Sequence, residues 1–123
     1  MEAIDLFVQP EPLLTSTINH LVKTGELHCH SHTLALGSFL FREGDDVRST
    51  FYIQHGIVRL YSDTPDGYSK TVFFHKAGTL IGFQELQRSD QCKPSILNAR
   101  AITKVDLLEI DGEAFGKYLH EHG

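Results

Sequence analysis

Three histidines alternate with a cysteine and a serine in the segment Glu-Leu-His-Cys-His-Ser-His-Thr at residues 26–33. Imidazole and thiolate are the usual protein ligands of zinc and related metals. In an extended strand, His28, His30 and His32 would share one face, about 7 Å apart, and could share one ion only if the strand bends. An exposed polar edge is therefore the first interpretation. A metal site and a surface that contacts RNA polymerase are the alternatives.

Cysteine chemistry is the second possibility. The two cysteines, Cys29 and Cys92, lie 63 residues apart and do not make a disulfide framework. Cys92 stands beside Lys93 in a polar segment, which would favour its thiolate and allow a redox pair. An iron–sulfur cluster usually needs four cysteine ligands, so the sequence predicts no cofactor.

Size and charge restrict the classes of partner. The 123 residues allow one domain with one core, and 41% of them are hydrophobic. Eleven basic and 16 acidic side chains give a net charge of −5, which argues against strong binding of this chain to DNA or an anionic membrane. No apolar run reaches the roughly 20 residues of a membrane span, and the first nine residues lack the features of a signal peptide. These features predict a cytoplasmic protein.

Short helices are expected at both ends of the chain. Residues 10–24 place Leu14, Ile18 and Leu21 at positions i, i+4 and i+7, which gives one apolar helical face. Residues 113–123 also begin with a helical pattern. Neither segment carries an apparent catalytic motif, so the chemistry must lie between them.

The region after Gly25 is typical of short strands. Runs rich in β-branched and aromatic residues alternate with turn signals, and Asp66-Gly67 between two such runs is a strong hairpin signal. Strands of about five or six residues at this spacing predict an all-β, antiparallel barrel or jelly roll.

Residues 28–110 resemble the effector-binding domain of the Crp/Fnr transcription regulators, which has the cyclic-nucleotide-binding fold. The resemblance implies an antiparallel double-stranded β-helix (a jelly-roll barrel) with short helices at both ends, and no enzymatic activity. The resemblance rests on the order and spacing of short motifs along the chain: FLFREGD at 39–45, FYIQHGIVRLY at 51–61, PDG at 65–67, AGTLIGFQEL at 77–86, ARA at 99–101 and VDLLEI at 105–110.

The ligand cassette departs from the family pattern. Members that bind cyclic nucleotides read roughly Gly-Glu-x-Gly and then Arg-Ser/Thr-Ala, where the Glu binds the ribose and the Arg neutralises the phosphate. Here Gly82 matches the first glycine, but Phe83 replaces the glutamate and Glu85 the second glycine. Lys93 or Ser95 takes the arginine position. The resemblance therefore implies an effector other than cyclic AMP.

Aromatic residues near the cassette predict a small apolar or aromatic effector. Phe73, Phe74 and Phe83 would line its site, with Tyr61 beside them; the alternative is that these rings only fill the barrel. The predicted effector-binding residues are Leu60, Val72, Phe73, Gly82, Phe83, Gln84, Glu85, Lys93, Ser95 and Ile96.

The sequence resembles, within that family, the regulators of reductive dehalogenation, which sense halogenated phenols. If an ionised phenol binds, Lys93 or His75 would stabilise its negative charge.

The chain ends at Gly123, about where the long dimerisation helix of the family would begin. The resemblance therefore implies one sensor domain over residues 1–123, with the dimerisation helix and the helix-turn-helix domain outside this chain. The implied partners are a small-molecule effector, DNA through the missing domain, RNA polymerase, and a second copy in a full-length homodimer, with no membrane.

Two alternatives stay open. One is a stand-alone cyclic-nucleotide-binding regulatory module that has no DNA-binding half. The other is a cupin-like metal-dependent enzyme using the three histidines. A cupin places an acid shortly after its second histidine, whereas here no acid follows His32 until Glu43.

Overall fold

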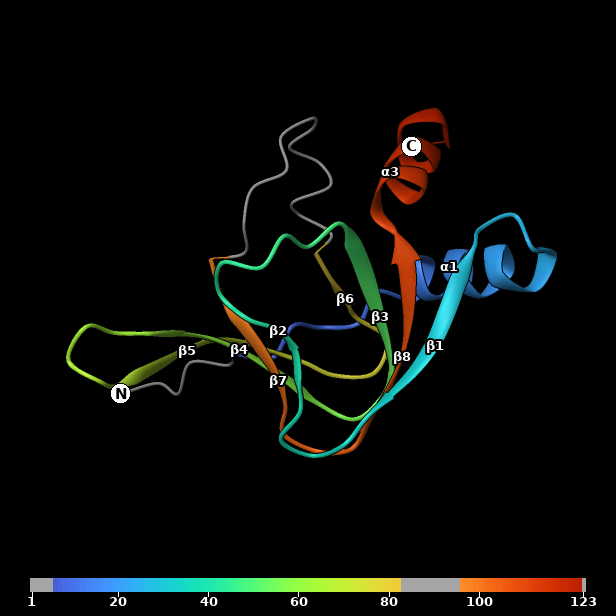
Figure 1. The fold of residues 1–123 in the computed structure, drawn as a ribbon. Helices are drawn as coiled ribbons and strands as arrows, with labels where there is room; N and C mark the ends of the chain where they lie inside the picture. Colours follow the sequence, from blue (N-terminus) through green and yellow to red (C-terminus); the bar gives the residue numbers. More distant parts are fainter. Residues whose placement is uncertain (1–5, 83–95, 123) are drawn as a thin grey trace.

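Two four-stranded antiparallel sheets form a roll, and two helices pack beside one of them (Figure 1). The computed structural model describes residues 6–82 and 96–122. The predicted all-β jelly roll with a short helix at each end is confirmed. No helix in these two described ranges is both long and apolar enough to cross a membrane.

The sheets combine strands from distant parts of the chain. The first sheet has the order β1-β8-β3-β6, with β1 at Cys29–Leu34, β8 at Val105–Asp111, β3 at Ser49–His55 and β6 at Leu80–Ile81. The second has the order β2-β7-β4-β5, with β2 at Phe39–Phe41, β7 at Asn98–Ala101, β4 at Val58–Asp63 and β5 at Ser69–His75. The helices are α1 at Pro12–Thr24 and α3 at Gly112–His122.

Helix α1 follows the apolar pattern of the sequence. It begins at Pro12, a residue that suits the first turn, and ends at Gly25, whose φ of +75° forms a left-handed cap. Its buried residues Ile18 and Leu21 pack with Phe115 of α3 against the outer side of the first sheet. The helices therefore shield this face of the roll from water.

A separate apolar core fills the inside of the roll. It draws side chains from both sheets, so burying it holds the two sheets together. Its buried members are Phe51, Ile53, Val58, Leu60, Ile81, Ala99, Ala101, Val105 and Leu107.

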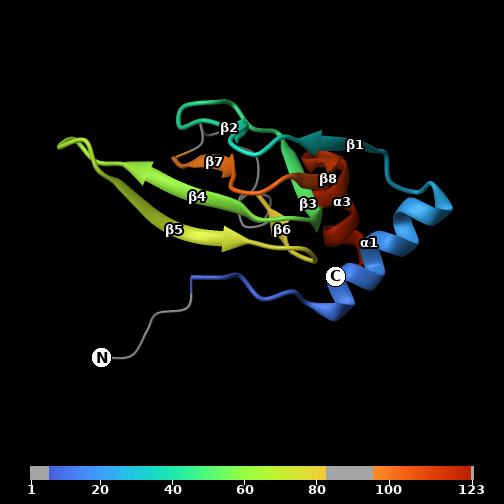
Figure 2. The ribbon, with the colours of Figure 1, turned by 90° about the horizontal axis from the view of Figure 1, so that it is seen from below.

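The edge of the second sheet is covered by the N-terminal segment. Figure 2 shows this segment running beside β5. The amide of Val8 donates to the Phe74 carbonyl at 2.9 Å, and the Phe7 ring stacks on Phe74 at 4.9 Å between centroids. An uncovered edge strand invites pairing with other chains, so this contact protects β5.

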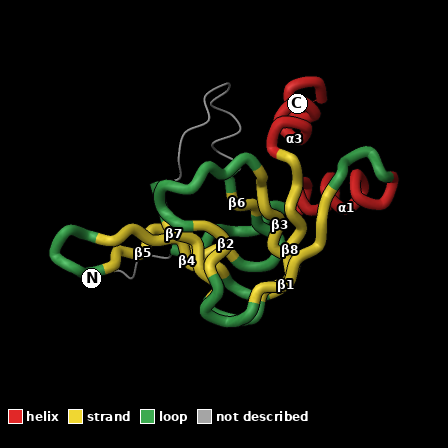
Figure 3. The backbone as a smooth tube through the Cα atoms, in the orientation of Figure 1, coloured by secondary structure: helices red, strands yellow, loops and turns green. Residues whose placement is uncertain are grey.

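The hairpin predicted from Asp66-Gly67 joins β4 and β5 and projects beyond the roll (Figure 3). The amide of Thr64 donates to the Tyr68 carbonyl at 2.7 Å, and Gly67 adopts a φ of +90°. The hairpin prediction is confirmed.

Candidate functional site

The histidine run lies on β1, an edge strand of the first sheet. His30 and His32 are exposed, and His32 Nε2 lies 2.8 Å from Glu109 Oε1. Hydrogen bonds from Ser49 and His32 hold the pKa of Glu109 below its ordinary value. No three His, Cys, Asp or Glu side chains in the described part of the chain are arranged to hold a metal. These residues therefore give no support to the metal alternative for His28, His30 and His32.

Half of the predicted effector residues can be placed. Phe83, Gln84, Glu85, Lys93 and Ser95 lie outside the described residues, as does Cys92 of the suggested redox pair. The described members are Leu60, Val72, Phe73, Gly82 and Ile96.

Leu60 and Phe73 lie directly opposite each other in the β4–β5 pair, so their side chains share one face. Leu60 belongs to the inner core and is 8% exposed, whereas Phe73 is 43% exposed. Val72 is the extra residue of a bulge between them and Thr71. An aromatic ring that is half open to solvent next to a buried core residue is a surface on which an apolar molecule can pack.

Phe74 and Tyr61 do not share the sheet face of Leu60 and Phe73. Phe74 pairs with Arg59 and stacks on Phe7, while the Tyr61 ring lies 4.3 Å from the guanidinium of Arg59. Alternation along β5 sends neighbouring phenylalanines to opposite faces. Of the described aromatic residues predicted for the effector site, only Phe73 shares the face of Leu60.

His75 is buried next to Phe73, with the two rings edge to face at 6.5 Å. The Thr79 hydroxyl donates to the Lys76 carbonyl, so its oxygen accepts from Nδ1–H of His75 at 3.0 Å. Burial lowers the pKa of His75 to about 4. The imidazole is therefore neutral at neutral pH.

The start of the cassette is held against β3. The Thr50 hydroxyl donates to the Ile81 carbonyl at 2.8 Å. Gly82 has a φ of +92°, and a Cβ there would lie 3.3 Å from the Ser49 carbonyl oxygen. The close backbone contact explains why glycine suits this position.

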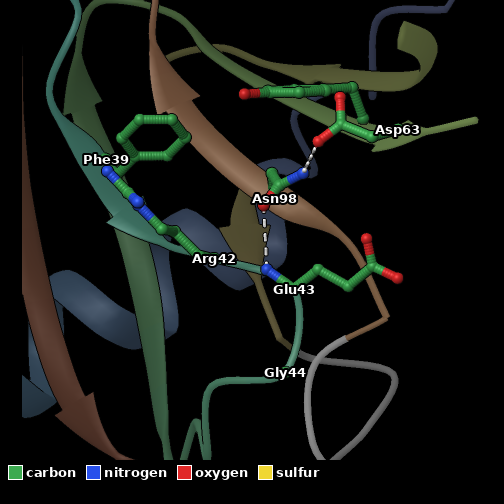
Figure 4. A pocket seen from close by; sticks show the side chains of 7 residues that line it. Phe39, Arg42, Glu43, Gly44, Asp63 and Asn98 are labelled. Atoms are coloured by element: carbon green, nitrogen blue, oxygen red, sulfur yellow. Dashed lines mark hydrogen bonds between the residues drawn. The ribbon is translucent and has the colours of Figure 1, made fainter. Parts of the chain in front are cut away.

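An open hollow of about 530 Å³ lies on the outer side of the second sheet (Figure 4). At its centre, Asn98 accepts a hydrogen bond from the Glu43 amide at 2.9 Å and donates to Asp63 at 3.3 Å. Arg42 stacks on Phe39 along one side, at 4.3 Å from the ring centroid. Sequence reasoning missed this region, although the alternation in Val-Arg-Leu-Tyr and Asn-Ala-Arg-Ala could have indicated a polar outer face.

The jelly roll with its cassette at the end of β6 agrees with a comparison against protein families. The family described as "Cyclic nucleotide-binding domain" matches residues 31–122, about three quarters of the chain. The chain belongs to this family. The predicted resemblance to the Crp/Fnr regulators is thereby supported at the level of the domain.

Curated relatives of this cyclic nucleotide-binding domain are transcription regulators of the Crp/Fnr type. The fumarate and nitrate reduction regulatory protein of Yersinia pestis is 32% identical over 75 residues, which cover 61% of this chain and 29% of the relative. The protein of the same name from Vibrio cholerae is 38% identical over 50 residues, 41% of this chain and 20% of the relative. The matches thus span less than a third of these relatives.

Solved structures share the fold of this cyclic nucleotide-binding domain. The sensor domain of the regulator DNR from Pseudomonas aeruginosa has a TM-score of 0.73 at 18% identity, covering 86% of this chain and 79% of that one. The c-di-GMP responsive regulator CLP of Xanthomonas campestris has a TM-score of 0.71 at 20% identity, covering 85% and 48%. Both are named as regulators. At these identities the likeness establishes the fold alone.

Proposed function

We propose that this chain is the effector-sensing domain of a Crp/Fnr-type transcription regulator and that its effector is a small apolar or aromatic molecule. The half-exposed Phe73 ring beside the buried Leu60 carries the proposal. The substitution of Phe83 for the family's ribose-binding glutamate supports it. A halogenated phenol is the effector to test first, on the resemblance of the sequence alone.

The proposed mechanism is a shift between two arrangements of the whole regulator. An effector bound against Leu60 and Phe73 would favour one arrangement, and a dimerisation helix and DNA-binding domain outside residues 1–123 would transmit the change. In this proposal the full-length protein is a cytoplasmic homodimer that binds DNA and contacts RNA polymerase.

Calorimetric titration with a chlorophenol, cyclic AMP and cyclic GMP tests the effector class. We expect the chlorophenol to bind and Phe73→Ala to weaken its binding about tenfold, because the ring loses apolar contact worth about 1.5 kcal/mol. Phe74→Ala is the matched control, since Phe74 points to the opposite face of the same strand and should leave the affinity unchanged.

Tight binding of cyclic AMP would contradict the proposed effector class, and equal losses in the two variants would contradict the assigned face. A full-length regulator whose DNA affinity does not respond to any bound effector would contradict the sensing role.

A further inference from the structure

We propose that the outer face of the second sheet is a docking surface for an acidic peptide segment of a partner protein. The surface, here called the arginine face, consists of three arginines and two aromatic rings: Arg42, Arg59, Arg100, Phe39 and Tyr61. It is separate from the proposed effector surface, because Arg59 and Leu60 are neighbours on β4 and point to opposite sides of the sheet.

The strand register brings two of the arginines together. Arg59 of β4 lies directly opposite Arg100 of β7, and Arg100 in turn lies opposite Phe39 of β2. Like charges at directly opposed positions of an antiparallel pair destabilise the sheet. An anion bound above them would remove this repulsion.

No acidic side chain of the described residues forms an ion pair with the arginine face. The ion pairs in this part of the structure join His32 to Glu109, Arg48 to Asp46, and His55 to Asp106, and none involves the arginine face. Among the described residues, no carboxylate makes an ion pair with these three guanidinium groups, and the acidic residues that line the same hollow as Arg42 are Glu43 and Asp63. Charge complementarity points to an acidic partner.

The guanidinium groups are already held in place. Arg59 donates from Nε to Thr71 at 2.7 Å and from Nη2 to Ser69 at 2.9 Å, and it lies 4.3 Å from the Tyr61 ring centroid. Arg100 donates from Nε to the Gly37 carbonyl at 2.9 Å. Each guanidinium carries five N–H donors, so further donors are left to grip a carboxylate. Groups fixed in advance lose less entropy on binding.

Phe39 fixes a second pair of arginines. Its ring centroid lies 4.3 Å from the guanidinium carbon of Arg42 and 5.1 Å from that of Arg100. Three cations thus stand over two rings on one sheet face. This arrangement suits the flat, forked carboxylates of glutamate and aspartate.

Two acidic residues of the hollow argue against a nucleic acid as the partner. Glu43 and Asp63 line the same hollow as Arg42 (Figure 4). The Glu43 backbone amide donates to Asn98, and the Asp63 carboxylate accepts from it. A nucleic acid presents phosphates along its whole length and would meet these carboxylates. A short acidic segment lying along Arg59 and Arg100 need not, so we favour a peptide.

Fluorescence anisotropy with labelled hexaglutamate tests the arginine face in the 123-residue chain. We expect saturable binding at low salt that weakens as salt is added, and a loss of about tenfold or more in the double variant Arg59→Gln, Arg100→Gln. Arg48→Gln removes one positive charge, half of what the double variant removes, from an arginine that is paired with Asp46, and should keep the affinity within about twofold.

A second variant separates loss of binding from loss of fold. Arg59→Lys with Arg100→Lys keeps both charges but removes the forks, and should bind hexaglutamate with an intermediate affinity. The glutamine double variant should still unfold in one cooperative transition, which shows that any loss of binding is not a loss of the fold. The proposal is overturned if hexaglutamate does not saturate, if Arg48→Gln weakens binding as much as the double variant, or if a short DNA duplex binds more tightly with the same dependence on Arg59 and Arg100.

Discussion

Replacing Gly56 with alanine is expected to lower the free energy of unfolding by about 3 to 5 kcal/mol, the sum of backbone strain and a steric clash. Gly56 joins β3 to β4 with a φ of +93°, a conformation that residues with a Cβ rarely adopt. A Cβ would also lie 2.2 Å from the Lys104 carbonyl oxygen and 2.7 Å from the Thr103 hydroxyl. Because the carbonyl belongs to the backbone, it cannot move away cheaply. Urea unfolding of the variant measures the loss.

Gly67→Ala is the matched control for this prediction. Gly67 has almost the same φ, +90°, but no atom lies within 4 Å of the position of a Cβ. Only the backbone cost remains, so we expect a loss of about 1 kcal/mol. Equal losses in the two variants would show that the close approach of Lys104 to Gly56 contributes nothing.

Lowering the pH from 6.5 to 4 is expected to destabilise the domain by up to about 3 kcal/mol through His75 alone. Burial lowers the pKa of His75 from 6.5 to about 4 in the folded protein. Above pH 6.5 the side chain is neutral in both states and has no effect on stability. Between pH 6.5 and 4 the unfolded chain binds a proton that the folded protein does not, so stability falls. Below pH 4 the folded protein binds it too, and the loss levels off.

Chemical unfolding at a series of pH values measures this effect, with His75→Asn as the comparison. The asparagine amide can still donate to Thr79, but it does not titrate. We expect the variant to be less stable at pH 7 because it fills less volume, yet to lose less stability than the parent between pH 6.5 and 4. Parallel curves for the two proteins would mean that His75 is not the group responsible.

Local patterns in the sequence were enough to predict the helices, the hairpin and the class of fold. The spacing of Leu14, Ile18 and Leu21 predicted α1, and Asp66-Gly67 predicted the turn between β4 and β5, because a helical face and a tight turn depend on residues close together in the chain. The glycine-rich order of motifs then indicated the jelly roll. Phe73 was placed near the effector surface on the same grounds, and its half-exposed ring is consistent with that proposal.

Pairing between distant strands decided the rest. A bulge at Val72 and the register of β5 send Phe74 to the outer face, where the sequence could not place it. The amino-acid sequence by itself determined which segments form strands and where they turn, since those preferences are local. Only the tertiary structure placed Arg59 opposite Arg100 and buried His75, which lowers the pKa of its imidazole. Charge pairing and solvation depend on neighbours that only the fold brings together.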